Sequence, residues 1–275
     1  MKFQKVWVCF FSATGTTRKI AETMARRLAQ QGGVPFGAVD FTTPAHRQTP
    51  PAFSEGDLVV VGTPVYAGRV PNLILPFVAA IQGNGAMAVP LVVYGNRAYD
   101  DALMELRNTL EAGGFRTVAG AAFIGEHSFG RALAAGRPDE SDLAMATRFA
   151  GQVFSKVEGI ENFDNHSPVF VRGNNPVGPY FRPTGPQGQA IDIRKVKPQT
   201  AETCNRCLWC VQHCPMGAID PEDPRQTPGI CIKCNACVKG CPQQAKAFDD
   251  PNYLFHKDDI TARYSAPRKE PECFL

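Results

Sequence analysis

The chain has 275 residues, 44% of them hydrophobic, so it is long enough for two domains and apolar enough to fill a sizeable core. Its 29 basic and 26 acidic residues leave a formal net charge of +3, which is too balanced for a protein that wraps nucleic acid or binds a membrane through a polybasic segment. Composition therefore excludes both as main partners and favours an ordinary globular protein.

The N-terminus shows no sign of a targeting segment. The apolar run at residues 6–11 is shorter than the roughly 7–15 residues of a signal-peptide core, and no small-residue cleavage site follows it. No stretch approaches the roughly 18 apolar residues that a membrane span requires. We therefore expect a soluble, cytoplasmic protein.

Residues 1–165 alternate short apolar runs with amphipathic segments, the pattern of an α/β domain with a parallel sheet flanked by helices. Strands are predicted at residues 5–11, 37–41, 57–62, 87–94 and 116–123. Helices are predicted at residues 17–31, 73–82, 99–112 and 140–157.

A loop of small and hydroxyl-bearing residues joins the first predicted strand to the first predicted helix. It reads Ser12-Ala13-Thr14-Gly15-Thr16-Thr17. Free backbone N–H groups and hydroxyls converge at such a helix N-terminus, where the helix dipole is positive, so the loop suits a phosphate. The motifs of nucleoside triphosphate and dinucleotide sites are both absent from it. Taken alone, the loop is as well explained by a simple helix cap.

Two further loops follow the third and fourth predicted strands. One contains Pro64-Val65-Tyr66-Ala67-Gly68, and the other contains Gly95-Asn96-Arg97-Ala98-Tyr99-Asp100. In a doubly wound sheet of strand order 2-1-3-4-5, the loops after strands 1, 3 and 4 meet at the carboxyl edge beside the topological switch point. We therefore expect the three loops to form one crevice.

The first loop is similar to the phosphate loop of flavodoxins, Ser/Thr-x-Thr-Gly-x-Thr, at Ser12, Thr14, Gly15 and Thr17. This resemblance spans roughly residues 4–160 and implies a flavodoxin-like, five-stranded parallel sheet of order 2-1-3-4-5 that binds FMN through the three loops. It casts Tyr66 as an aromatic that stacks on the flavin. The chain departs from that family in its basic first helix and in lacking the usual stacking tryptophan.

Residues 166–198 break the α/β pattern with Pro, Gly and Asn, and are predicted to be a linker. The linker carries five basic residues against the single acid Asp192. A solvated strap explains this charge better than a binding patch does.

Eight of the ten cysteines lie in residues 199–250, as two copies of the motif C-x2-C-x2-C-x3-C-P. Without a secretion signal, metal binding is favoured over disulfides. The motif is the bacterial 4Fe-4S pattern, in which the fourth cysteine binds the other cluster. It therefore predicts two 4Fe-4S clusters, one held by Cys204, Cys207, Cys210 and Cys241 and the other by Cys231, Cys234, Cys237 and Cys214.

The proline after each fourth cysteine suits the first position of a helix, so helices are predicted to begin at Pro215 and Pro242. Zinc is the alternative metal, but the crossed fourth cysteine has no purpose in a single-ion site. His213 is not needed as a ligand, because cysteines already fill all eight positions. The region resembles bacterial two-cluster ferredoxins, which implies a small α+β domain and one-electron transfer at low potential.

Residues 251–275 are too apolar for a free tail and are predicted to pack back on a domain. Over its whole length the chain resembles the flavodoxin–ferredoxin fusion proteins found mainly in anaerobic microbes, whose assigned role is electron transfer. The resemblance implies that FMN and two clusters link one-electron and two-electron carriers, with redox proteins or a low-potential donor and acceptor as partners.

Two other functions stay open. In an FMN-dependent reductase of a small substrate, Glu126, His127 and Ser128 reach the same sheet edge from the end of the fifth strand, although ordinary loop residues explain them more simply. In a redox sensor or structural cluster protein, the chain binds a partner without turnover. No catalytic residue is assigned.

Overall fold

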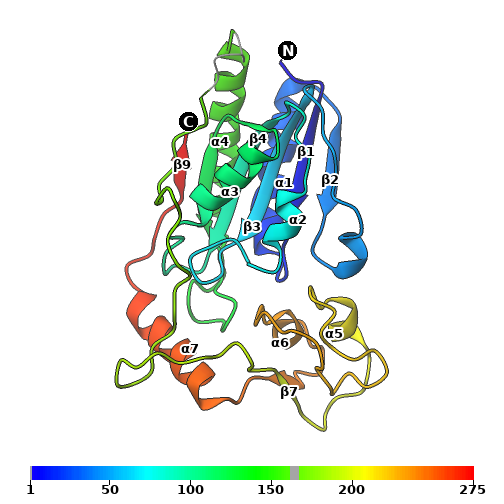
Figure 1. Ribbon diagram of the computed structural model, residues 1–275, viewed down its shortest axis with the longest axis vertical. Helices are drawn as coiled ribbons and strands as arrows, with labels where there is room; N and C mark the ends of the chain where they lie inside the picture. Colours follow the sequence, from blue (N-terminus) through cyan, green and yellow to red (C-terminus); the bar gives the residue numbers. More distant parts are fainter. Residues whose placement is uncertain (1, 162–166) are drawn as a thin grey trace.

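The computed structural model describes residues 2–161 and 167–275, and shows a larger α/β unit above a small cysteine-rich unit (Figure 1). The α/β unit contains β1 (Lys5–Phe10), α1 (Thr16–Gly32), β2 (Phe36–Asp40), a 3-10 turn (Pro44–His46), β3 (Asp57–Pro64), α2 (Leu75–Ala79), β4 (Met87–Tyr94), α3 (Ala102–Ala112), β5 (Arg116–Thr117), β6 (Gly120–Ile124) and α4 (Glu140–Gly159). The cysteine-rich unit contains β7 (Gln199–Thr200), α5 (Trp209–Gln212), α6 (Ala236–Lys239) and β8 (Lys246–Ala247). The chain then returns to the α/β unit through α7 (Pro251–Tyr264) and β9 (Glu272–Phe274).

The central sheet has the strand order β2-β1-β3-β4-β6-β9, and β5 also pairs with β4. All pairs from β2 to β6 are parallel, whereas β9 runs antiparallel to β6. The predicted flavodoxin-like α/β class and order of the parallel strands are therefore confirmed. The C-terminal β9 adds an edge strand that the sequence pattern did not predict.

The predicted fifth strand is split into β5 and β6. The register shifts by one residue between them, because Met87 faces Arg116 whereas Leu91 faces Ala121. One extra residue on one strand is the mark of a β-bulge. Pro90, which has no N–H to donate, lies in β4 beside this bulge.

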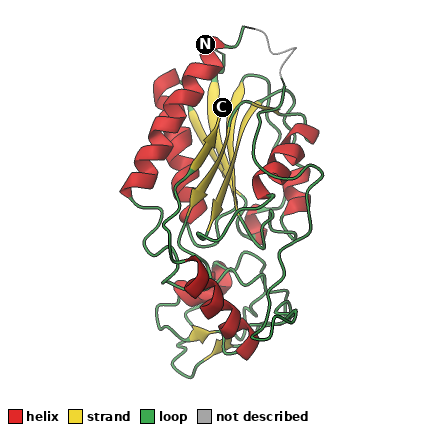
Figure 2. Cartoon of the chain, turned by 90° about the vertical axis from the view of Figure 1, so that its left-hand side faces the viewer, coloured by secondary structure: helices red, strands yellow, loops and turns green. Residues whose placement is uncertain are grey.

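Apolar layers cover both faces of the sheet, with α1 and α4 on one side and α2 and α3 on the other (Figure 2). Met24 of α1 and Phe149 of α4 are fully buried on the first face. Leu106 of α3 is fully buried on the second. The periodicity predicted these helices well, except that the helix predicted at residues 73–82 shortens to α2. Its end instead forms a parallel bridge between Gln82 and Ala52.

The predicted linker packs against the α/β unit over its first half. Val169 and Val171 are buried in the core of the second face. The Asp101 carboxylate accepts hydrogen bonds from the backbone N–H groups of Asn174 (2.8 Å) and Gly178 (2.7 Å). This part of the segment is therefore packed rather than solvated. The predicted boundary at residues 165 and 166 lies outside the described residues.

Within residues 2–161 and 167–275, every helix is too short or too polar to cross a lipid bilayer.

Candidate functional site

A cleft of about 410 Å³, open to solvent, lies at the carboxyl edge of the sheet; we call it the carboxyl-edge cleft. The predicted residues that line it are Ser12, Ala13, Thr14, Thr16, Thr17, Pro64, Val65, Tyr66 and Gly95. The other lining residues are Val93, Tyr94, Gly125, Glu126, His127 and Ser128. The structure thus brings the three loops together, as the strand order requires.

The first loop has the features of an anion site. Gly15 takes a left-handed φ of 87° at the start of α1, where an added Cβ would meet no atom within 4 Å. The Ser12 hydroxyl accepts a hydrogen bond from the Arg18 N–H (3.0 Å). The Thr17 hydroxyl oxygen is buried and has no hydrogen-bond partner among the described residues. Because an unpaired buried hydroxyl costs about 1–3 kcal/mol, a polar ligand such as the FMN phosphate fits this loop.

The loop at residues 95–100 reaches the cleft only through Gly95. Asn96 is 3% exposed, and its side-chain amide donates to the carbonyl of Tyr264 (2.6 Å) and accepts from the N–H of Lys269 (3.1 Å). The Tyr99 hydroxyl donates to Glu272 (2.9 Å). This loop is therefore tied to the C-terminal segment. The predicted flavin-binding residues that do not line the cleft are Gly15, Ala67, Gly68, Asn96, Arg97, Ala98, Tyr99 and Asp100.

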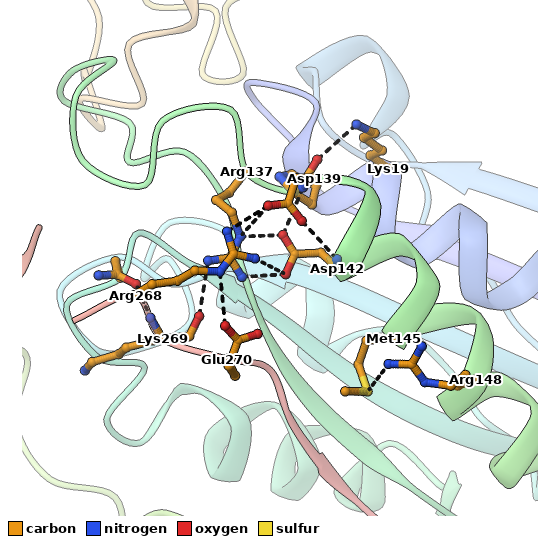
Figure 3. A network of polar contacts seen from close by, with 11 residues as sticks. Lys19, Arg137, Asp139, Asp142, Met145, Arg148, Arg268, Lys269 and Glu270 are labelled. Carbon is orange, nitrogen blue, oxygen red and sulfur yellow. Dashed lines mark hydrogen bonds and ion pairs between the residues drawn. The ribbon is translucent and has the colours of Figure 1, made fainter. Parts of the chain in front are cut away.

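A polar network fastens the C-terminal segment to the start of α4 (Figure 3). The buried Arg137 guanidinium pairs with the fully buried Asp142 carboxylate and donates to the Lys269 carbonyl (3.1 Å). Arg268 donates to Asp139 (2.7 Å), and this hydrogen bond holds the pKa of Asp139 well below its usual value. Asp139 and Asp142 also form a capping box at the start of α4. The segment that anchors Asn96 is thus itself held in place.

Glu126 and His127 connect the cleft to the cysteine-rich unit. The ammonium of Lys239, on α6, pairs with the Glu126 carboxylate (2.7 Å) and donates to the His127 carbonyl (2.7 Å). Burial and the positive charges of Lys239, His256 and Arg97 lower the pKa of His127 to about 3. The ring of His127 is therefore neutral at pH 7. From the sequence, these two residues were interpreted as ordinary loop residues. The one feature that pointed to the cleft was their position after a strand that ends at the carboxyl edge.

The eight cysteines of the two motif copies surround two cavities. The first cysteine cavity, of about 320 Å³, contains Cys204, Cys207, Cys210 and Cys241 in its lining. The second cysteine cavity, of about 360 Å³, contains Cys214, Cys231, Cys234 and Cys237. Each cavity thus combines three cysteines of one copy with the fourth of the other, as the crossed ligand pattern requires. The described residues contain no group of three or more His, Cys, Asp or Glu side chains spaced for a single metal ion.

The local backbone explains how each copy wraps its cavity. Leu208 and Asn235, at equivalent positions, take positive φ values of 61° and 57° directly before α5 and α6. The N–H groups of Ala218 and Ala245 each donate to the sulfur of the fourth cysteine of their copy, at 3.2 Å. The Thr227 hydroxyl in the second cavity is buried without a partner among the described residues. Hydroxyl and N–H donors of this kind suit the sulfurs of an iron–sulfur cluster.

The helices predicted after the prolines do not form. Turns follow Pro215 and Pro242, because Gly217 and Gln244 take positive φ values of 58° and 50° that an α-helix does not allow. The short helices α5 and α6 lie before the prolines instead. His213 stacks on Trp209, with ring centroids 4.0 Å apart, and lines neither cavity.

The second cysteine cavity faces the carboxyl-edge cleft. Met216 and Ile232, which line this cavity, also pack against the core of the α/β unit. Arg47 donates to the Pro215 carbonyl across the junction (2.5 Å). Burial and the nearby thiols of Cys234 and Cys231 hold the pKa of Tyr66 well above its usual value. Tyr66, which lines the cleft, is therefore near Cys231 and Cys234 of the second cavity, whereas Cys207 of the first cavity is exposed.

Two family models match the two units of the chain separately. A comparison with curated proteins finds no match. Similar solved structures include an NADH:FMN oxidoreductase (17% identity over 57% of this chain and 92% of that one, TM-score 0.44) and a flavodoxin from Streptococcus pneumonia TIGR4 (20% identity, 55% and 99%, TM-score 0.39). Flavodoxin 2 from Bacillus cereus is also similar (17% identity, 55% and 98%, TM-score 0.40). Residues 7–112 match the model of a flavodoxin domain, and residues 203–246 match that of a 4Fe-4S dicluster domain. The chain therefore contains a flavodoxin domain and a 4Fe-4S dicluster domain in one polypeptide, which matches a flavodoxin–ferredoxin fusion.

Proposed function

We propose that the protein transfers electrons between FMN in the carboxyl-edge cleft and two 4Fe-4S clusters in the cysteine cavities, and so links one-electron and two-electron carriers. FMN exchanges one or two electrons, whereas each cluster exchanges one. The partners are redox proteins or a low-potential electron donor and acceptor. The observation that carries the proposal is the lining of the two cavities, where eight cysteines divide into two crossed sets of four. The same chain contains a cleft whose first loop suits a phosphate.

The chain's own residues have distinct tasks in this function. Ser12, Thr14 and Thr17 hold the phosphate together with the N–H groups at the start of α1. Tyr66 presents an aromatic side chain both to the cleft and toward the second cysteine cavity. Lys239 fastens α6 to the loop after β6 and so keeps the two domains together. The exposed edge at Cys207 is where a redox partner reaches the first cavity.

A reductase of a small substrate is the second candidate, because Glu126 and His127 line the cleft. Such an enzyme needs an acid or base that is ready at neutral pH. The Glu126 carboxylate is ion-paired with Lys239, and the pKa of His127 is lowered to about 3. His127 is therefore not a general acid at pH 7 and Glu126 is engaged by Lys239, so the relay is the better supported function.

The test is anaerobic purification followed by cofactor analysis and stopped-flow reduction. We expect one FMN and about eight irons per chain. We also expect fast electron exchange with added one-electron carriers, followed at flavin and cluster wavelengths. Saturable turnover of one small molecule in place of this exchange favours the reductase, and failure to reduce any carrier favours a sensor. Protein without flavin, or with far fewer irons, overturns the proposal.

A further inference from the structure

At one cavity-lining position the two motif copies differ in charge, with a buried apolar residue in one copy and a buried lysine in the other. After the fourth cysteine, the first copy continues Pro215-Met216-Gly217-Ala218-Ile219, and the second continues Pro242-Gln243-Gln244-Ala245-Lys246. Ala218 and Ala245 make the same N–H to sulfur hydrogen bond, so the two segments have equivalent geometry. Ile219 and Lys246 therefore occupy equivalent positions, one apolar and one charged.

The crossed arrangement places these two side chains at different cavities. Ile219 lines the second cysteine cavity, and Lys246 lines the first. Both are 3% exposed. The Lys246 ammonium donates to the Thr200 hydroxyl (2.7 Å) and to the Pro224 carbonyl (2.5 Å), which are neutral groups. Among the residues that the structure describes, no carboxylate forms an ion pair with Lys246.

A buried ammonium without a counter-charge is costly, because it loses its hydration and gains only neutral partners. A 4Fe-4S cluster with four thiolate ligands carries a net negative charge, which grows by one unit on reduction. A fixed positive charge at the lining of the cavity stabilises the reduced cluster more than the oxidised one. Such a charge raises the reduction potential of the cluster.

We infer that Lys246 is the buried counter-ion of the cluster held by Cys204, Cys207, Cys210 and Cys241, and that it raises the reduction potential of this outer cluster. The inference rests on the proposed function, because it requires both clusters. The outer cluster includes the exposed Cys207, whereas the inner cluster, in the second cavity, faces the cleft. Lys246 thus favours reduction of the outer cluster, next to the exposed edge at Cys207 that a partner reaches.

Arg206 also lines the first cavity, but its side chain is mostly exposed and pairs with the Asp223 carboxylate (3.6 Å). The Lys233 ammonium bonds to the carbonyls of Arg194 and Cys231 and does not line the second cavity. We expect removal of the Lys246 charge to lower the reduction potential of the outer cluster more than that of the inner one, because Lys246 lines only the outer cavity.

The test compares reduction potentials in the intact, cluster-loaded protein. Potentiometric titration is followed by EPR and by the hyperfine-shifted NMR signals of the cysteine β-protons, which report each cluster separately. Lys246→Met and Lys246→Gln should lower the outer potential, and so shift the distribution of one electron toward the inner cluster by about tenfold or more, as expected for loss of a nearby unit charge. Lys246→Arg, which keeps the charge, should retain the outer potential.

The matched control is the equivalent position of the other copy. Ile219→Lys should raise the inner potential and leave the outer one less changed. If Lys246→Met loses iron, Lys246→Gln and Ile219→Lys still decide the question. Unchanged potentials, or an equal shift of both clusters, overturn the inference even where the protein still exchanges electrons. If the unsubstituted protein does not exchange electrons with carriers, the proposed function is overturned instead. The measured reduction potentials still decide the inference about Lys246.

Discussion

Each candidate site contains a buried polar group that the described residues leave either without a hydrogen-bond partner or without a counter-charge. Thr17 in the carboxyl-edge cleft and Thr227 in the second cysteine cavity have hydroxyl oxygens without hydrogen-bond partners. Lys246 in the first cavity has only neutral partners. Because buried polar groups are normally paired and these three line the candidate sites, a bound group at each site would supply the missing partner.

Thr17→Val removes the unpaired hydroxyl of the phosphate loop. We expect FMN to bind about tenfold more weakly, a loss of about 1.4 kcal/mol, because one hydrogen bond to the phosphate disappears. The measurement is fluorescence quenching of FMN titrated into flavin-depleted protein. Thr23→Val is the control, because the Thr23 hydroxyl donates to the Lys19 carbonyl within α1. An unchanged dissociation constant contradicts the assignment.

Cys214→Ala removes a cysteine of the second cavity although it belongs to the first motif copy. We expect the inner cluster to be damaged more than the outer one, because the ligand sets are crossed. Iron analysis and EPR of the reduced protein measure this. Cys241→Ala is the matched variant and should damage the outer cluster. Selective loss of the outer cluster in Cys214→Ala contradicts the crossed assignment.

His127 links stability to pH. Its pKa is lowered to about 3 in the folded protein, so below its ordinary pKa of 6.5 the unfolded chain takes up a proton that the folded chain does not. The free energy of unfolding should therefore fall by about 1 kcal/mol between pH 7.5 and 5.5. Anaerobic denaturant titrations at the two pH values measure it. His127→Gln should remove this part of the pH dependence, and an equal fall in the variant refutes the link.

At the scale of elements, the C-terminal segment completes the flavodoxin domain. β9 adds an antiparallel edge strand to β6, and the chain just before it holds the Asn96 side chain. The two domains are therefore interleaved in sequence, because the flavodoxin domain ends after the cysteine-rich unit. Contacts with the C-terminal segment hold the loop at residues 95–100 through Asn96 and Tyr99.

Truncation after Tyr264 removes β9, Arg268 and the Asn96 partners Pro267 and Lys269. We expect a lower melting temperature, by about 2–4 °C for each kcal/mol lost, together with weaker FMN binding. Calorimetry and FMN titration measure the two effects. Asn96→Gly separates them, since glycine tolerates the positive φ of 61° but cannot bond to the segment. This variant should weaken FMN binding with a smaller loss of stability, and unchanged FMN binding in both variants contradicts the role of the anchor.

At the scale of the whole molecule, several contacts hold the two domains at a defined junction. Tyr253 of α7 packs between Phe129 of the flavodoxin domain and Phe248 of the ferredoxin domain, with ring centroids 4.8 and 4.3 Å away. Lys239 pairs with Glu126. Electron transfer needs such a fixed arrangement, because the protein's task is to position cofactors.

Lys239→Met should loosen this junction. We expect a loss of about 2 kcal/mol, because the half-buried Glu126 carboxylate is left unpaired. We also expect slower electron equilibration between flavin and clusters, measured by laser-flash reduction. Lys257→Met is the control, because the Lys257 ammonium pairs with its exposed neighbour Asp258 (3.2 Å). Equal rates of electron equilibration in the two variants would show that the Lys239–Glu126 ion pair does not position the domains.

Features that depend on neighbours along the chain could be predicted from the sequence. The apolar alternation predicted the parallel sheet, and the motif spacing predicted that each set of three cysteines surrounds one cavity. Which side chains of the loops reach the cleft depends on the folded arrangement. Asn96 and Tyr99 turn to the C-terminal segment, and Glu126 and His127 reach the cleft, because those contacts join residues far apart in sequence. The local sequence pattern does not predict such contacts.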